Sequence, residues 1–194
     1  NGLTAVAPLR QPTQAHDQQG KLKIMDAKEY IQQQIAGARR LFDAAMQNTT
    51  DDQLNWTPPA DTVNPISVTA LHVLGSEDVF IQQILLGQPR LWESEGWANK
   101  IGVAEPPGRG GGWAEVRNAT LSVEAVLAYQ AALRTATDAY LAALTAEELD
   151  RPVNVMGGQR PVATVLILLA HHACSHAGEI ATVKGMQGIK GLPF

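Results

Sequence analysis

The sequence carries two histidines, His172 and His176, four positions apart in an apolar stretch long enough for a helix. Residues four apart on an α-helix lie on one face, with roughly 5–6 Å between their Cβ atoms. Two imidazoles at this spacing can bind one metal ion, with each nitrogen at roughly 2.0–2.1 Å from it. The other residues of that face are mostly apolar: Val165, Leu168, Leu169, Val183 and Met186. We therefore expect the pair to point into a protein core.

A buried histidine pair has two interpretations, because an unpaired polar group is costly in a core. The rings could share a metal ion, or they could form an ordinary core pair bonded to the backbone and Ser175. We favour the metal, because a third histidine, His72, lies in another apolar stretch. Gly75 and Ser76 are small residues on its face, so they leave room for an ion or a substrate.

Four stretches with helical periodicity would position these histidines. Asp26 and Glu29 have the spacing of a capping box at the start of the first. Asn64-Pro65 suits the start of the second, and Ser122 suits the start of the third. The stretches are residues 26–47, 65–86, 122–144 and 161–186. No strand is convincing, so the pattern predicts an all-α four-helix bundle, a fold that builds metal sites between facing helices.

The connection over residues 90–120 is too long for a plain connector and is typical of a lid or a pocket wall. It contains Trp92, Trp97 and Trp113, which could line a pocket mouth or simply pack. Arg109 lies in its glycine-rich run and could meet an anionic substrate. We expect residues 1–24 to be a flexible tail or a cloning remnant, and residues 25–194 to form one metal-binding domain.

Composition narrows the class of protein. The net charge of −4 over 194 residues disfavours a nucleic-acid surface, which is usually basic. The single cysteine, Cys174, excludes an internal disulfide and fits a reducing compartment. The longest apolar run, residues 162–170, is about half the length of a membrane span. We expect a cytoplasmic protein that binds neither nucleic acid nor membrane.

Three segments together resemble the DinB/YfiT-like metalloenzyme superfamily, whose members are four-helix bundles. The first segment is Asn55-Trp-Thr-Pro-Pro-Ala-Asp61, followed by Asn64-Pro65. The second is Leu71-His-Val-Leu-Gly-Ser-Glu-Asp78, and the third is His172-Ala-Cys-Ser-His-Ala-Gly-Glu-Ile180. The third matches the H-x-x-x-H-x-G-[EQ] helix of the family. The combination is more specific than the histidine spacing alone.

The resemblance implies a divalent metal, nickel or zinc, bound by His72, His172 and His176. It also implies a small-molecule substrate, and a homodimer is common among relatives. Some relatives are transferases or isomerases that use a low-molecular-weight thiol, so we predict a thiol-dependent transferase or a hydrolase. The alternative is a stress-related bundle that binds a metal or small ligand without catalysis, and a dimeric interaction protein with a vestigial site is a third possibility. The insert over residues 90–120 departs from the family pattern and affects the identity of the substrate.

Several other residues have more than one interpretation. Glu179 lies one turn beyond His176, where it could accept a ring N–H, act as a general base, or pair with a neighbouring helix. Glu77 and Asp78 point away from His72, so we expect them to be solvated or paired between helices. His171 is expected at the surface or an interface, with a ligand exchange with His172 as the alternative, and Cys174 is expected to be a packing residue.

Overall fold

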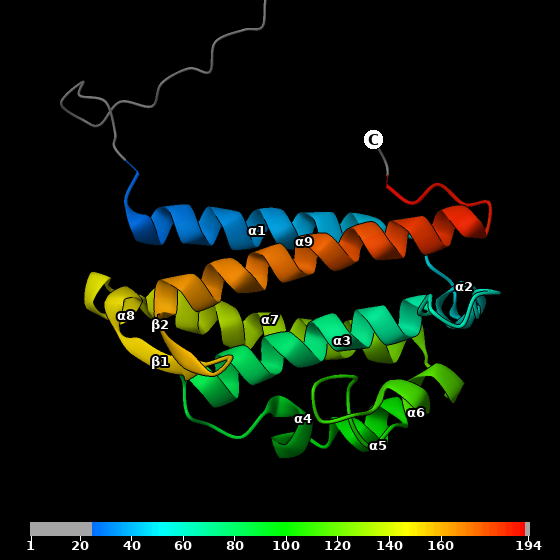
Figure 1. The fold of residues 1–194 in the computed structure, drawn as a ribbon, viewed down its shortest axis with the longest axis horizontal. Helices are drawn as coiled ribbons and strands as arrows, with labels where there is room; N and C mark the ends of the chain where they lie inside the picture. Colours follow the sequence, from blue (N-terminus) through cyan, green and yellow to red (C-terminus); the bar gives the residue numbers. More distant parts are fainter. Residues whose placement is uncertain (1–24, 193–194) are drawn as a thin grey trace, which may run out of the picture.

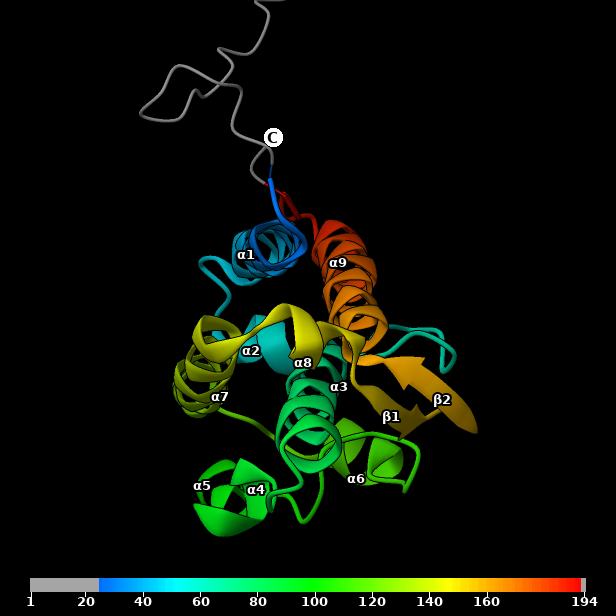
Figure 2. The same ribbon diagram turned by 90° about the vertical axis from the view of Figure 1, so that its left-hand side faces the viewer.

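The structure is a computed structural model that describes residues 25–192, and the expected tail over residues 1–24 lies outside this range. Four long helices lie side by side (Figures 1 and 2). They are α1 (Ala27–Met46), α3 (Ile66–Asp78) with its π-helical continuation η1 (Val79–Leu85), α7 (Val123–Ala143) and α9 (Val162–Met186). The all-α prediction is confirmed, and the predicted helix limits agree within a few residues.

The order of the helices explains the long connection. Helices α1 and α9 run in one direction, whereas α3 and α7 both run in the opposite direction (Figure 1). The chain must therefore return along the length of the bundle between α3 and α7. This crossover, residues 86–122, is only partly a loop, because it contains the short helices α4 (Leu91–Ser94), α5 (Trp97–Ile101) and α6 (Trp113–Asn118). They cover the outer side of α3 (Figure 2).

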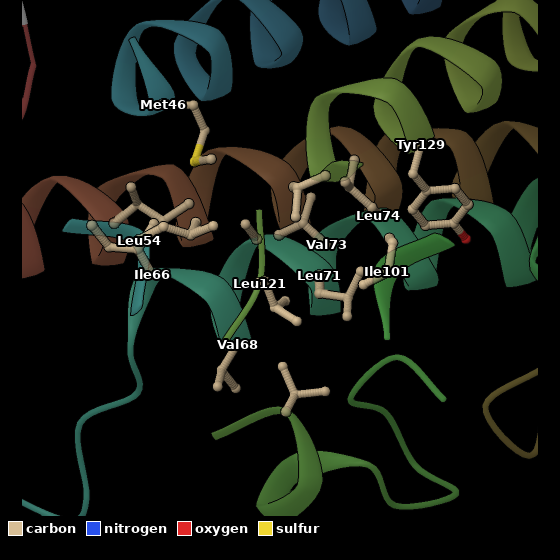
Figure 3. Close-up of a cluster of buried hydrophobic side chains, with 14 of the residues drawn as sticks. Met46, Leu54, Ile66, Val68, Leu71, Val73, Leu74, Ile101, Leu121 and Tyr129 are labelled. Carbon is tan, nitrogen blue, oxygen red and sulfur yellow. The ribbon is translucent and has the colours of Figure 1, made fainter. Parts of the chain in front are cut away.

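The core fills the space between the long helices and extends beneath the crossover (Figure 3). Helix α3 is apolar on nearly all sides because α9, α7 and α6 all contact it. Trp92 and Trp97 are buried here, with ring centroids 5.3 Å and 5.2 Å from that of Tyr129. These two tryptophans hold the crossover on the bundle, so packing explains them and a pocket mouth does not.

Helix ends are satisfied in different ways. The Asp26 side chain accepts a hydrogen bond from the Glu29 amide, as the capping pattern predicts. At the other end of α1, the buried Lys184 of α9 donates to the carbonyls of Ala45 and Gln47, at 3.0 and 2.8 Å. Helix α3 starts one residue later than predicted, with Pro65 as its N-cap. The short helices α2 (Asp51–Asn55) and α8 (Ala146–Asp150) are capped by the threonines that precede them.

The sequence gives no convincing strand, yet β1 (Pro152–Val155) and β2 (Gly158–Pro161) form an antiparallel hairpin. Val153 and Val155 alternate inward and are buried. The turn residues Met156 and Gly157 both have positive φ, 51° and 79°, which two-residue hairpin turns require. The strands are too short for their periodicity to stand out among glycines and prolines.

Within the described part of the chain, no helix combines the length and the hydropathy needed to cross a membrane.

Candidate metal centre

The structure brings the three predicted histidines together at the middle of the bundle. His72 projects from α3, and His172 and His176 project from α9. The Nε2 atom of His172 lies 3.0 Å from that of His72 and 3.1 Å from that of His176. The three rings are steeply inclined to one another, with centroids 4.4 to 4.9 Å apart. The three Nε2 atoms therefore converge on one region.

Two of the rings are held by hydrogen bonds at their far nitrogen. His72 donates through Nδ1 to the carbonyl of Pro107 in the crossover, at 2.8 Å. His176 donates through Nδ1 to the Glu179 carboxylate, also at 2.8 Å. Each bond leaves the Nε2 lone pair of its neutral ring directed at the cluster. Such bonds commonly orient metal-binding histidines.

The crossover also fixes His72 from the side. The ring of Trp113 lies 4.8 Å from that of His72, centroid to centroid. Gly75, one turn after His72, allows Pro106 to approach: a Cβ at residue 75 would lie only 2.5 Å from the Pro106 Cβ. The room that we expected beside His72 is therefore partly occupied by the crossover. No sequence pattern indicates Pro107, because its role depends on a backbone carbonyl.

The surroundings favour uncharged imidazoles. Burial lowers the pKa of His72, and the neighbouring His176 lowers it further. Burial, followed by His176 and His72, lowers the pKa of His172 to about 4. Both rings are neutral near pH 7, and only neutral imidazole binds a metal.

The donor set fits a metal ion. Two nitrogens bound at roughly 2.0–2.1 Å to one ion lie about 2.9 Å apart at a right angle and about 3.3 Å apart at a tetrahedral angle. The observed 3.0 and 3.1 Å fall within that span. Without an ion, one proton on His172 Nε2 would have to serve two neighbouring lone pairs. At most one of the three facing Nε2 atoms carries a proton, so hydrogen bonds between the rings cannot satisfy all of them. The Nδ1 atom of His172 is buried and has no partner among the described residues.

A pocket of about 630 Å³ opens beside His72 and His172. Its walls come from α3, η1, α9, the crossover and the hairpin. The lining includes Ser76, Val79, Phe80, Leu168, Met156 and Arg109. Its size is that of a small-molecule site. Of the three tryptophans, Trp113 alone contacts a histidine of the cluster in the described structure.

The other candidates lie elsewhere. Glu77 bonds to Arg39 of α1 and Thr137 of α7, which is the expected pairing between helices. Asp78 is fully buried and bonds to Tyr129 of α7, so the solvated alternative is wrong for it. His171 is exposed, as expected. Cys174 is half-buried and packs against the apolar cluster between α1, η1 and α9.

Comparison with known proteins gives the family. A family model described as the DinB superfamily matches residues 34–180. The chain belongs to the DinB superfamily. The matched residues include His72, His172 and His176, and the assignment confirms the resemblance of the motifs.

A solved structure also resembles this DinB-superfamily chain. It is the crystal structure of a conserved protein from Enterococcus faecalis, with a TM-score of 0.69 and 19% sequence identity. The likeness covers 83% of this chain and 96% of that chain, and it supports the fold. No curated protein matches the chain.

Proposed function

We propose that this DinB-superfamily chain is a divalent-metal-dependent enzyme. His72, His172 and His176 would hold a nickel or zinc ion and leave a coordination position open towards the pocket. The convergence of the three Nε2 atoms carries the proposal. Three protein ligands with an open position are typical of catalytic sites, whereas structural zinc usually has four protein ligands. Nitrogen ligands disfavour magnesium and calcium.

The reaction that we propose is a thiol-dependent transfer, with hydrolysis as the alternative. When bound, the ion would favour the thiolate form of a coordinating thiol, or would lower the pKa of a coordinating water towards about 7. The protein would keep the rings of His72 and His172 neutral by burial. The family resemblance of the motifs favours the thiol over water.

Glu179 would serve as a positioning residue, and its geometry also suits a base. One of its oxygens accepts from His176 Nδ1 and fixes the direction of that ring. Its side chain is 57% exposed, so the carboxylate is also reachable from solvent. A carboxylate that orients a ligand and remains accessible could accept a proton from an incoming thiol or water.

Metal content tests the first part of the proposal. The full chain is purified without a metal-affinity tag, analysed for its elements, stripped with a chelator and titrated with Ni²⁺ and Zn²⁺. We expect one ion per chain, and His172→Ala should weaken binding at least 100-fold. The matched control is His171→Ala, because His171 is the exposed histidine next to it on α9. Equal affinities for the two variants would overturn the metal site.

Catalysis needs a separate test. The metal-loaded protein is incubated with chlorodinitrobenzene and several low-molecular-weight thiols, and conjugation is followed by absorbance. We expect turnover that depends on added metal and is lost in His172→Ala. Metal binding without turnover of any thiol or of model esters would instead favour the non-catalytic, ligand-binding alternative.

A further inference from the structure

The pocket beside the histidines has one apolar wall and one wall made of backbone. Val79 and Phe80 of η1 and Leu168 of α9 form the apolar side, and residues 106–111 of the crossover form the other. Met156 at the hairpin turn also lines the pocket, although 55% of its surface is exposed. Its φ of 51° is rarely adopted by a residue with a side chain. The hairpin thus presents an apolar side chain at the pocket edge, where an apolar ligand would cover it.

The two arginines that line the pocket, Arg90 and Arg109, differ in whether they have acidic partners. Arg90 is engaged, because its Nε donates to Glu93 at 2.7 Å and a terminal nitrogen donates to Glu105 at 2.9 Å. Glu105 shares this guanidinium with Glu93. Arg109 makes no hydrogen bond or ion pair with any described residue, and it is exposed. Of the cationic side chains that line the pocket in the described structure, Arg109 is therefore the one without an acidic partner.

The backbone holds Arg109 at the pocket edge. Gly108 and Gly111 exchange two hydrogen bonds, N to O, of 2.9 and 3.2 Å, so Arg109 and Gly110 form the tip of a closed turn. The Trp113 indole donates to the Gly108 carbonyl at 2.9 Å, and its ring contacts His72. The turn is thus connected to the histidine cluster through one side chain.

The approach of the turn also requires a glycine. Gly112 has a φ of 83°, and a Cβ there would lie 2.9 Å from the carbonyl oxygens of Glu105 and Pro106. These contacts keep the backbone of the turn close to the pocket. A guanidinium in that place can bind an oxyanion through two parallel hydrogen bonds.

We propose that this pocket binds a small organic anion with an apolar body, and that Arg109 pairs with its negatively charged group. The apolar body would lie along Val79, Leu168 and Met156, with one end close to His72 and His172. The proposal deepens the proposed function and rests on it only for the statement that this ligand is the substrate. Binding itself does not depend on a metal ion.

Two fluorescent probes of the same shape test the proposal. 8-Anilino-1-naphthalenesulfonate carries an anionic group, whereas N-phenyl-1-naphthylamine has the same aromatic body without the charge. Dissociation constants are measured for the full chain, both as purified and after chelation. We expect Arg109→Gln to weaken sulfonate binding about tenfold at low ionic strength and to change the neutral probe less than about twofold. Arg109→Lys should restore part of the affinity.

Two further variants and a salt titration show whether the change in probe binding arises at the pocket. Arg40→Gln removes an exposed arginine of α1 that does not line the pocket, and it should change neither probe. Met156→Gln should weaken both probes about threefold, because it removes apolar contact without touching the core. Added salt should weaken the sulfonate in the wild type and have less effect in Arg109→Gln.

The outcomes separate the two proposals. An Arg109→Gln variant that binds both probes as the wild type does, or that loses both equally, would overturn the anion pocket. Failure of either probe to bind the wild type would also overturn it. Since the measurement is repeated after chelation, a chain that binds the sulfonate through Arg109 but takes up no metal would retain this pocket and lose the metal proposal.

Discussion

His72 and Asp78 both project from helix α3, and the protein surrounds them differently. Asp78 is fully buried and receives three hydrogen bonds, from the amides of Leu91 and Trp92 at 2.9 Å and from the Tyr129 hydroxyl at 2.7 Å. His72 is paired at Nδ1, but its Nε2 faces another ring nitrogen. Asp78 is satisfied by three donors, whereas the Nε2 atoms of His72 and His176 share at most the one proton of His172 Nε2.

The difference separates a structural role from a binding role. Asp78 holds the start of α4 and joins it to α7, so it anchors the crossover that covers the outer side of α3 (Figure 2). In the histidine cluster, three Nε2 atoms face one another, and at most one of them can carry a proton. Buried polar groups are normally satisfied, and an ion bound by the three Nε2 atoms would satisfy the lone pairs that one shared proton cannot.

The largest effect should follow from removing Asp78. Asp78→Ala would leave three buried donors without an acceptor, and each such donor costs about 1–3 kcal/mol. We expect the free energy of unfolding to fall by at least about 3 kcal/mol, measured by urea unfolding of the metal-free protein. Variants that still fold should retain their affinity for metal, because Asp78 does not contact the histidine cluster in the described structure.

The control is Asp61→Ala, which removes an acid whose side chain is fully exposed in a turn. It should change the free energy of unfolding by less than about 0.5 kcal/mol. A loss below about 1 kcal/mol in Asp78→Ala would show that the buried cluster is not the anchor described above.

The sequence predicts the histidine cluster better than it predicts the contacts of Asp78. Helical spacing places His172 and His176 on one face, and apolar periodicity places the four long helices, because both signals repeat along the chain. The contacts of Asp78 are different: its three donors come from residues 13, 14 and 51 positions away, and no local pattern records them. The same reason hides Pro107, whose carbonyl meets His72 across 35 positions. The hairpin is not predictable from periodicity, because each of its strands has only four residues.

A smaller effect should follow from Glu179→Gln, which keeps the size of the side chain and removes its charge. The carboxylate orients His176 and strengthens its ring nitrogen as a donor to a metal, and loss of such a partner commonly weakens metal binding 10–100-fold. We expect about a tenfold loss of affinity, measured by calorimetry with Ni²⁺ and Zn²⁺, without a change in the stability of the metal-free protein.

Glu124→Gln serves as the matched control, because Glu124 is an exposed acid in the first turn of α7. Its metal affinity should equal that of the wild type. An unaltered affinity in Glu179→Gln would mean that the negative charge of Glu179 does not contribute to metal binding, because the glutamine oxygen can still accept from His176 Nδ1.

The smallest effect concerns acid, where the two regions should respond with opposite sign. The folded pKa of His172, about 4, lies below its ordinary value of 6.5, because burial, His176 and His72 disfavour the charged ring. Between these pH values the unfolded chain binds more protons, so the free energy of unfolding falls as the pH falls from about 6.5 towards 4. Burial raises the pKa of Asp78 above its ordinary 3.8, so its contribution rises as the pH falls towards that value.

Urea unfolding of the chelated protein at pH 7 and pH 5 measures the sum of the His172 and Asp78 contributions to the free energy of unfolding. The histidine contribution should amount to on the order of 1 kcal/mol at pH 5, because solvent screens part of the pKa shift. His172→Ala should lose that part of the pH dependence, whereas His171→Ala should keep it. If His172→Ala and the wild type lose the same stability between pH 7 and pH 5, then burial does not keep the His172 ring neutral, and the contrast with Asp78 disappears.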